Sequence, residues 1–120
     1  MKSEIKQKWL NALRNGEYSQ GRYQLRDDCN HFCCLGVLCD LYLKETNQEW
    51  IDGNGQFDYF IPSKNGDAGE VLTQEVIEWA DLKELNPTID TGYRKKQISE
   101  LNDFENLSFD EIADLIESQL

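Results

Sequence analysis

The sequence lacks the features that mark membrane proteins, secreted proteins and the familiar enzyme classes. It contains no run of about 18 apolar residues, so we expect no membrane-spanning segment and no membrane partner. Its first residues, MKSEIKQKWLNALRNG, alternate charged and apolar side chains and lack the apolar stretch of a signal peptide, which favours a cytoplasmic location. The motifs GxSxG and HExxH and the Walker loop are absent. These absences predict a non-enzymatic protein with no catalytic residues and no cofactor.

Histidine occurs once, at His31, which limits the nucleophile–base pairs that the chain can form. A Cys-His nucleophile needs its base within reach of the sulfur and a third group that orients the base. His31 and Cys33 would diverge on a helix, although they would share a face on a strand. A thiol-dependent enzyme acting through Cys33 is therefore a third hypothesis. The plainer interpretation places His31 on the surface or at the start of a helix.

Basic residues are also scarce, since 12 Lys and Arg stand against 23 Asp and Glu, for a net charge of −11. Most of the basic excess lies in residues 1–26, whereas residues 98–120 contain acidic residues and no basic one. Phosphates would be repelled, so we expect no nucleic-acid partner. A basic protein surface is the expected partner, unless the acidity only keeps the protein in solution. The candidate protein-binding residues are Asp103, Glu105, Asp110, Glu111, Asp114 and Glu117.

The length and the hydrophobic pattern predict one α+β domain over residues 1–120. We expect about four helices around a buried central helix, at about residues 32–45, with a small antiparallel sheet or hairpin. The sequence EWIDGNGQFDYFIP is typical of a β-hairpin because DGNG favours a tight turn. Alternation around Tyr23 and Leu25 predicts a short strand over residues 22–26. Residues 86–97 indicate no more than a short strand and a turn.

Polar residues mark the expected ends of the other helices. Ser3 is the expected N-cap of a first helix, which ends at Asn15-Gly16. Thr73 is the expected N-cap of a third helix. A single helical turn is expected from Ser99. Ser108 opens a capping box, which predicts a last helix with an apolar stripe.

The central segment reads HFCCLGVLC, and Cys29 precedes it, so three of the four cysteines fall in nine residues. On a helix Cys33, Cys34 and Cys39 would point in directions about 100–140° apart, which does not suit a single metal ion. Unbonded cysteine often packs in the core as a small apolar residue. We therefore predict core packing, with a metal site completed from elsewhere and a reactive thiol as alternatives. Gly36 in the middle of this helix predicts close approach by another backbone.

The segment GEYSQGRYQLR, residues 16–26, combines aromatic, amide and guanidinium groups. Such groups suit a phosphate-bearing base or another anionic small molecule. The competing interpretation is a connecting strand whose arginines offset the acidic surface. The candidate ligand-binding residues are Arg14, Tyr18, Gln20, Arg22, Tyr23 and Arg26.

Four blocks of the sequence resemble a group of small uncharacterised proteins from phage and bacterial genomes. The blocks are WLNALRNGEYSQG, FCCLGVLCDLY, EVIEWADL and ISELNDFENLSFDEIADLIESQL. The chain departs from the pattern at SKNGDAGEVLTQ and at Asp81, where a glycine is common. The resemblance implies an accessory protein, associated with phage, that acts on host machinery by binding.

The leading hypothesis is therefore a phage-associated accessory protein that binds and inhibits a host protein with a basic surface, such as a defence component, in the host cytoplasm. The alternative is a protein that sequesters a nucleotide-like ligand through residues 14–26. The sequence leaves a homo-oligomer open, because the apolar helix and the aromatic residues suit either one core or a dimer face.

Overall fold

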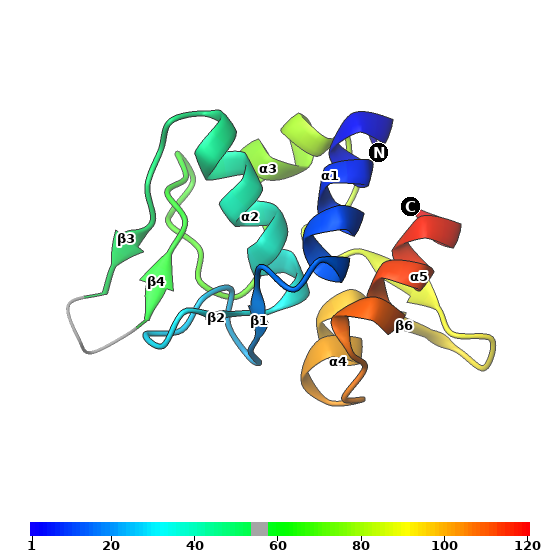
Figure 1. Cartoon of the computed structure of the whole chain (residues 1–120). Helices are drawn as coiled ribbons and strands as arrows, with labels where there is room; N and C mark the ends of the chain where they lie inside the picture. The colour runs from blue at the N-terminus through cyan, green and yellow to red at the C-terminus, as the bar shows by residue number, and fades with distance from the viewer. Residues whose placement is uncertain (54–57) are drawn as a thin grey trace.

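Helix α2 lies at the centre of the fold, with the other helices and the short strands arranged around it (Figure 1). The computed structural model describes residues 1–53 and 58–120. It confirms the α+β class. Its helices are α1 (Ser3–Arg14), α2 (Cys34–Glu45), α3 (Gln74–Ala80), α4 (Ile98–Asp103) and α5 (Phe109–Gln119). Its strands are β1 (Ser19–Gln20), β2 (His31–Phe32), β3 (Ile51–Asp52), β4 (Tyr59–Phe60), β5 (Thr88–Asp90) and β6 (Lys95–Gln97).

The strands pair two by two. Strands β3 and β4 form the antiparallel hairpin that the sequence predicts, although Asn54 and Gly55 of its expected turn lie outside the described residues. Strands β5 and β6 form a second antiparallel hairpin where the sequence indicates only a short strand and a turn. Strands β1 and β2 pair in parallel. No helix in the described part of the chain is long and apolar enough to cross a membrane.

The predicted strand over residues 22–26 is wrong. Tyr23 has a positive φ of 71°, which interrupts an extended backbone, and only Arg26 of that segment forms an isolated bridge, to Phe32. The strand that forms instead is Ser19–Gln20, which pairs with His31–Phe32. His31 is therefore an exposed strand residue, in agreement with its expected surface position.

Three of the predicted helix starts can be checked at their caps. The Thr73 hydroxyl accepts a hydrogen bond from Val76 N, and Ser108 forms the complete capping box with Glu111, so both predictions are confirmed. The predicted cap at Ser3 is wrong, because Lys2 occupies the N-cap and Ser3 is already helical. Lys2 N donates to Ala80 O at 2.9 Å, which fixes the extended backbone one residue earlier.

The predicted core packing of the cysteine segment is confirmed. Cys33, Cys34 and Cys39 are 2%, 0% and 0% exposed, and all four cysteines, including the exposed Cys29, are unbonded. Cys33 is the N-cap of α2 and its sulfur accepts a hydrogen bond from Gly36 N. The close approach predicted at Gly36 is also confirmed, because a Cβ there would lie 1.7 Å from Leu25 O. The segment before β2 thus packs its backbone directly on α2.

Asp81 ends α3 in the left-handed conformation, with φ 56° and ψ 48°, at the position where the resembling proteins commonly have glycine. A side chain is strained in this conformation and glycine is not. We expect Asp81→Gly to raise the free energy of unfolding by about 0.5 kcal/mol, measured by urea denaturation. Asn47→Gly is the matched control, because Asn47 also has φ 56° but asparagine tolerates it better. A loss of stability in Asp81→Gly would contradict this account.

Candidate functional site: a groove between the β5–β6 hairpin and α5

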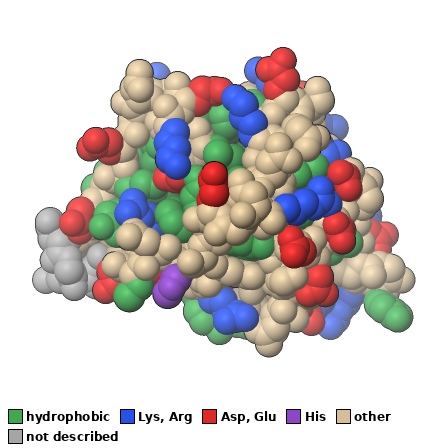
Figure 2. Space-filling view, in the orientation of Figure 1, with side chains coloured by type: hydrophobic (Ala, Val, Ile, Leu, Met, Phe, Trp, Pro, Cys, Tyr) green, Lys and Arg blue, Asp and Glu red, His purple; other side chains and the backbone are tan. Residues whose placement is uncertain are grey.

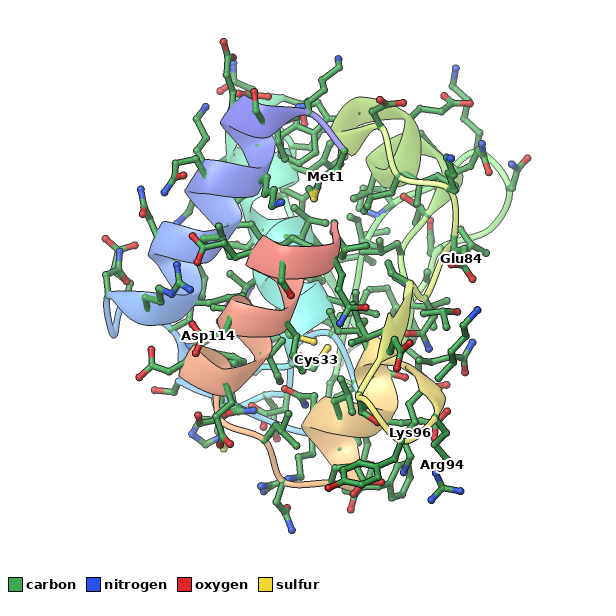
Figure 3. The ribbon with its side chains drawn as sticks, turned by 90° about the vertical axis from the view of Figure 1, so that its right-hand side faces the viewer. Met1, Cys33, Glu84, Arg94, Lys96 and Asp114 are labelled. Atoms are coloured by element: carbon green, nitrogen blue, oxygen red, sulfur yellow. The ribbon has the colours of Figure 1, made fainter. Side chains whose placement is uncertain are left out.

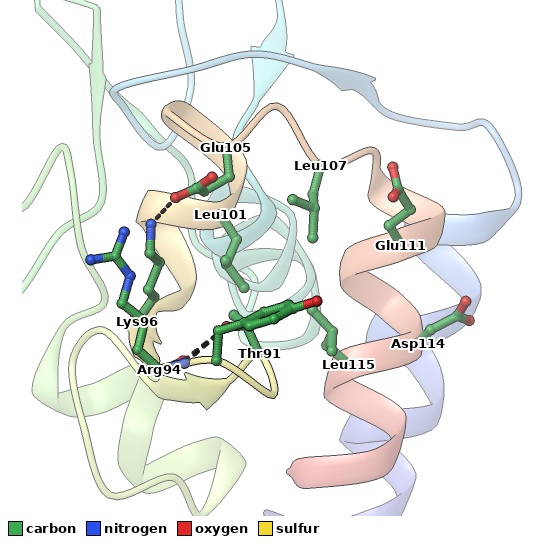
Figure 4. A pocket seen from close by; sticks show the side chains of 10 residues that line it. Thr91, Arg94, Lys96, Leu101, Glu105, Leu107, Glu111, Asp114 and Leu115 are labelled. Carbon is green, nitrogen blue, oxygen red and sulfur yellow. Dashed lines mark hydrogen bonds and ion pairs between the residues drawn. The ribbon is translucent and has the colours of Figure 1, made fainter.

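A groove of about 610 Å³ lies between the β5–β6 hairpin and α5, with α4 at its base (Figure 4). The hairpin, α4 with the loop that follows it, and α5 all contribute to its walls. The residues that line it are Thr91, Tyr93, Arg94, Lys96, Leu101, Glu105, Leu107, Glu111, Asp114 and Leu115. It is therefore built almost wholly from the C-terminal third of the chain.

The groove has an apolar floor. Leu101 is buried, whereas Leu107 and Leu115 are half-buried and point between the hairpin and α5. Tyr93, in the hairpin turn, is 98% exposed. Large apolar surface that solvent reaches in this way is typical of a contact site for another molecule.

Charged side chains flank this floor on both sides. Glu111 and Asp114 belong to α5, whereas Arg94 and Lys96 belong to the hairpin, on the opposite side of this face (Figure 3). Lys96 forms an ion pair with Glu105 across the base of the hairpin. The rim is therefore acidic along α5 and contains both signs of charge along the hairpin.

A buried amide network holds these walls in position. Asn102 is 0% exposed, and its Oδ1 accepts from Gln20 Nε2 at 2.9 Å and from Cys34 N at 3.3 Å. Gln20 Nε2 also donates to Leu107 O, and Gln20 Oε1 accepts from Phe109 N. The network joins β1, α2, α4 and the start of α5, so the loop under the groove cannot shift without breaking buried hydrogen bonds.

The six predicted protein-binding carboxylates separate into two groups. Glu105, Glu111 and Asp114 line the groove, and the exposed Asp110 and Glu117 lie on the same helix, α5. Asp103 instead accepts hydrogen bonds from Tyr23 N and Asn102 Nδ2, which gives it a structural role. Asp114 and Glu117 both pair with Arg14, at 2.7 and 3.3 Å. These two ion pairs are exposed and therefore weak enough to exchange partners.

Figure 2 shows the balance of charge on one face of the molecule, where Lys and Arg side chains are interspersed with Asp and Glu. The Arg14 pairs explain part of this pattern, because a basic residue of the N-terminal helix reaches across to α5. These carboxylates also raise the pKa of the Arg14 guanidinium. The basic N-terminal segment thus offsets part of the acidic C-terminal one.

The structure does not bring the six candidate ligand-binding residues into one place. Arg14 contacts α5, Gln20 belongs to the buried amide network, and Tyr23 packs against Phe104 with ring centroids 5.5 Å apart. Arg22 is exposed. The remaining two, Tyr18 and Arg26, line a second hollow against α2.

The thiol and metal alternatives can be placed as well. Burial raises the pKa of Cys33 to about 12, so its thiol stays protonated at neutral pH and is a poor nucleophile. In the described ranges, one group of candidate metal-ligand side chains comes together, namely Asp27, Asp28 and Cys29 at the surface. Asp27 is already engaged by Cys29 N and by His31 N and Nδ1.

The sequence-based reasoning missed the hairpin's contribution to the groove, including Thr91, Tyr93, Arg94 and Lys96. The one available signal was the TGYRKK stretch, in which a tyrosine follows a turn glycine among basic residues. Gly92 has φ 91°, and that turn projects Tyr93 into solvent.

Comparison with known proteins identifies a family. No curated protein and no solved structure matches the chain. A family model described as a domain of unknown function (DUF8296) matches residues 1–120, a range that contains all the sequence blocks, the buried cysteine helix and the groove. The chain therefore belongs to this family of domains of unknown function.

Proposed function

We propose that this protein is a non-enzymatic binding protein whose groove between the β5–β6 hairpin and α5 docks a basic, amphipathic segment of a partner protein. The observation that carries the proposal is the combination of an apolar floor with a row of carboxylates along one rim. The resemblance to phage-encoded proteins adds a context in which the partner is a host protein, such as a defence component, that binding inhibits.

The floor provides the apolar contact that a docked segment needs. Leu107 and Leu115 are half-buried, so their accessible surface would be covered by an apolar side chain of the partner. Tyr93 is nearly fully exposed, and aromatic residues of this kind are often the strongest single contributors to an interface. The volume of the groove, about 610 Å³, accommodates a few side chains rather than a whole domain surface.

Charge complementarity favours a basic segment. Asp110, Glu111, Asp114 and Glu117 lie along α5, and no basic residue occurs after Lys96. Arg14, the basic residue that contacts this row, is held only by exposed ion pairs that a partner's Lys or Arg can replace. Such a row of carboxylates speeds encounter with basic surfaces and disfavours acidic ones.

A matched pair of peptides tests the proposal. The probe is an amphipathic helical peptide of Leu and Lys, and its counterpart has Glu in place of every Lys. We expect the Lys peptide to bind, and Tyr93→Ala to weaken it by about tenfold without loss of thermal stability, because Tyr93 is 98% exposed. Calorimetric titration gives the affinity, and Leu85→Ala, at a residue 44% exposed and outside the groove lining, is the control.

The charge component has a separate readout. Asp110→Lys combined with Asp114→Lys should slow association several-fold at low salt, and added salt should slow the unmodified protein in the same way. Glu70→Lys, at another exposed position, is the control. Equal binding of the two peptides, or equal effects of the Leu85 and Tyr93 variants, would refute the proposal.

A further inference from the structure

We propose that a second hollow, between α2 and the segment from Tyr18 to Phe32, binds the oxyanion of a small molecule, a carboxylate or a phosphate, through Arg26 and Lys44. This site is independent of the proposed docking groove, with which it shares no lining residue. Its volume is about 530 Å³. It is lined by Glu17, Tyr18, Ser19, Arg26, Cys29, Asn30, Phe32, Asp40 and Lys44.

Arg26 is held in place by aromatic rings and by an amide. Its guanidinium lies 3.9 Å from the ring centroid of Tyr59 and within 6 Å of those of Phe32 and Trp50, at 5.6 and 5.8 Å. Its Nε and Nη2 both donate to Asn30 Oδ1, at 3.2 and 2.6 Å. The guanidinium is therefore fixed before any ligand arrives, which reduces the entropy lost on binding.

Arg26 has no acidic counter-ion in the part of the chain that the structure describes. Its partner Asn30 is a neutral amide, and each of the ion pairs found there joins other residues. A guanidinium has five N–H donors, and one amide oxygen leaves several of them available. An oxyanion at this edge would supply both the missing charge and the missing acceptors.

The acidic side chain nearest to the second cation is already occupied. Asp40 accepts from Tyr18 Oη at 2.5 Å, Trp50 Nε1 at 2.9 Å and Lys44 Nζ at 3.1 Å. Burial alone would raise the pKa of Asp40, but these hydrogen bonds outweigh it and the pKa lies below its usual value. The carboxylate is thus ionised and paired, and Lys44, whose side chain is 68% exposed, keeps donors for a ligand.

The polar edge continues into an aromatic wall, which extends the ligand chemistry beyond the oxyanion. Tyr18 and Phe32 meet edge to face, with ring centroids 5.0 Å apart, and both line the hollow. A planar group attached to the oxyanion can pack against these rings. The site therefore suits an aromatic acid or a nucleotide better than an aliphatic cation or a neutral sugar.

Nuclear magnetic resonance of the full chain tests this site. Phosphate and acetate are titrated separately while the Arg26 Nε–H resonance is followed, and adenosine monophosphate and adenosine are compared. We expect saturable shifts with millimolar phosphate or acetate, and none with adenosine. Tighter binding of the nucleotide than of phosphate would identify an attached ring as part of the ligand, whereas equal binding would identify the free oxyanion.

Variants locate the binding. Arg26→Gln should abolish the saturable response, followed on neighbouring backbone resonances, and Lys44→Gln should weaken it by about threefold to tenfold. Lys44 provides a second test if Arg26→Gln fails to fold, because its side chain is largely exposed. Lys83→Gln, at an exposed lysine outside the hollow, is the control. Absence of saturation, adenosine binding as tightly as the nucleotide, or equal effects of Lys44→Gln and Lys83→Gln would overturn the proposal.

Discussion

Replacing Gly36 by alanine is expected to remove most of the stability of the fold. The added Cβ would lie 1.7 Å from Leu25 O and 2.6 Å from Leu25 C, well inside any allowed contact. These atoms are backbone, and Cys33 N donates to Leu25 O while Leu25 N donates to Gly69 O. The clash cannot be relieved by rotating a side chain, so the segment must separate from α2. We expect a loss of more than about 4 kcal/mol of the free energy of unfolding.

Urea denaturation measures this loss, and circular dichroism shows whether any folded protein is left. The matched control is Gly16→Ala, since Gly16 has φ 79° and no atom lies within 4 Å of the Cβ that alanine would add there. That substitution introduces backbone strain without a clash and should cost about 1–2 kcal/mol. If Gly36→Ala were as stable as Gly16→Ala, the close packing of residues 25 and 36 would be wrong.

Raising the pH above about 9 is expected to unfold the protein steeply, through its buried thiols. Burial raises the pKa of Cys33 to about 12 and raises those of Cys34 and Cys39 as well, whereas an unfolded cysteine titrates at about 8.5. Below about pH 8.5 both states keep these protons and stability does not change. Above it the unfolded chain releases three protons that the native state retains. The free energy of unfolding should then fall by about 4 kcal/mol per pH unit.

Urea midpoints measured at a series of pH values provide the slope. Cys39→Ala removes one of the three thiols, so its slope should be about two-thirds of the original, although the variant starts from a lower stability because it leaves a cavity. Tyr18 adds to the loss at higher pH, since burial and Asp40 raise its pKa to about 12. A flat profile up to pH 10, or an unchanged slope in Cys39→Ala, would mean that the thiols are accessible in the native state.

The features that could be predicted from the sequence are those that depend on neighbouring residues. The capping box at Ser108 and the cap at Thr73 are formed by side chains that bond to backbone three residues away. The central cysteine helix was predictable because its residues are apolar on nearly every side. Gly36 was an informative exception, since a helix keeps such a costly residue where another backbone comes close.

The features that could not be predicted depend on contacts between distant segments. Strand β1 pairs in parallel with a strand twelve residues further along, and no local pattern specifies such a pair. The candidate ligand residues of segment 14–26 are close in sequence, but the chain turns at Tyr23 and Gly16, so Arg14 and Arg26 face different elements. The groove needs the β5–β6 hairpin beside α5, an arrangement that only the tertiary structure reveals.

The central claim, that the groove docks a partner protein, is tested most directly by photo-crosslinking in the cells that naturally contain the chain. A benzophenone amino acid is placed at position 107 in the groove or at position 85 outside it. We predict that position 107 captures one defined protein through a basic segment with apolar residues, and that position 85 does not. Capture of the same protein from position 85 alone, or capture through an acidic segment, would contradict the account.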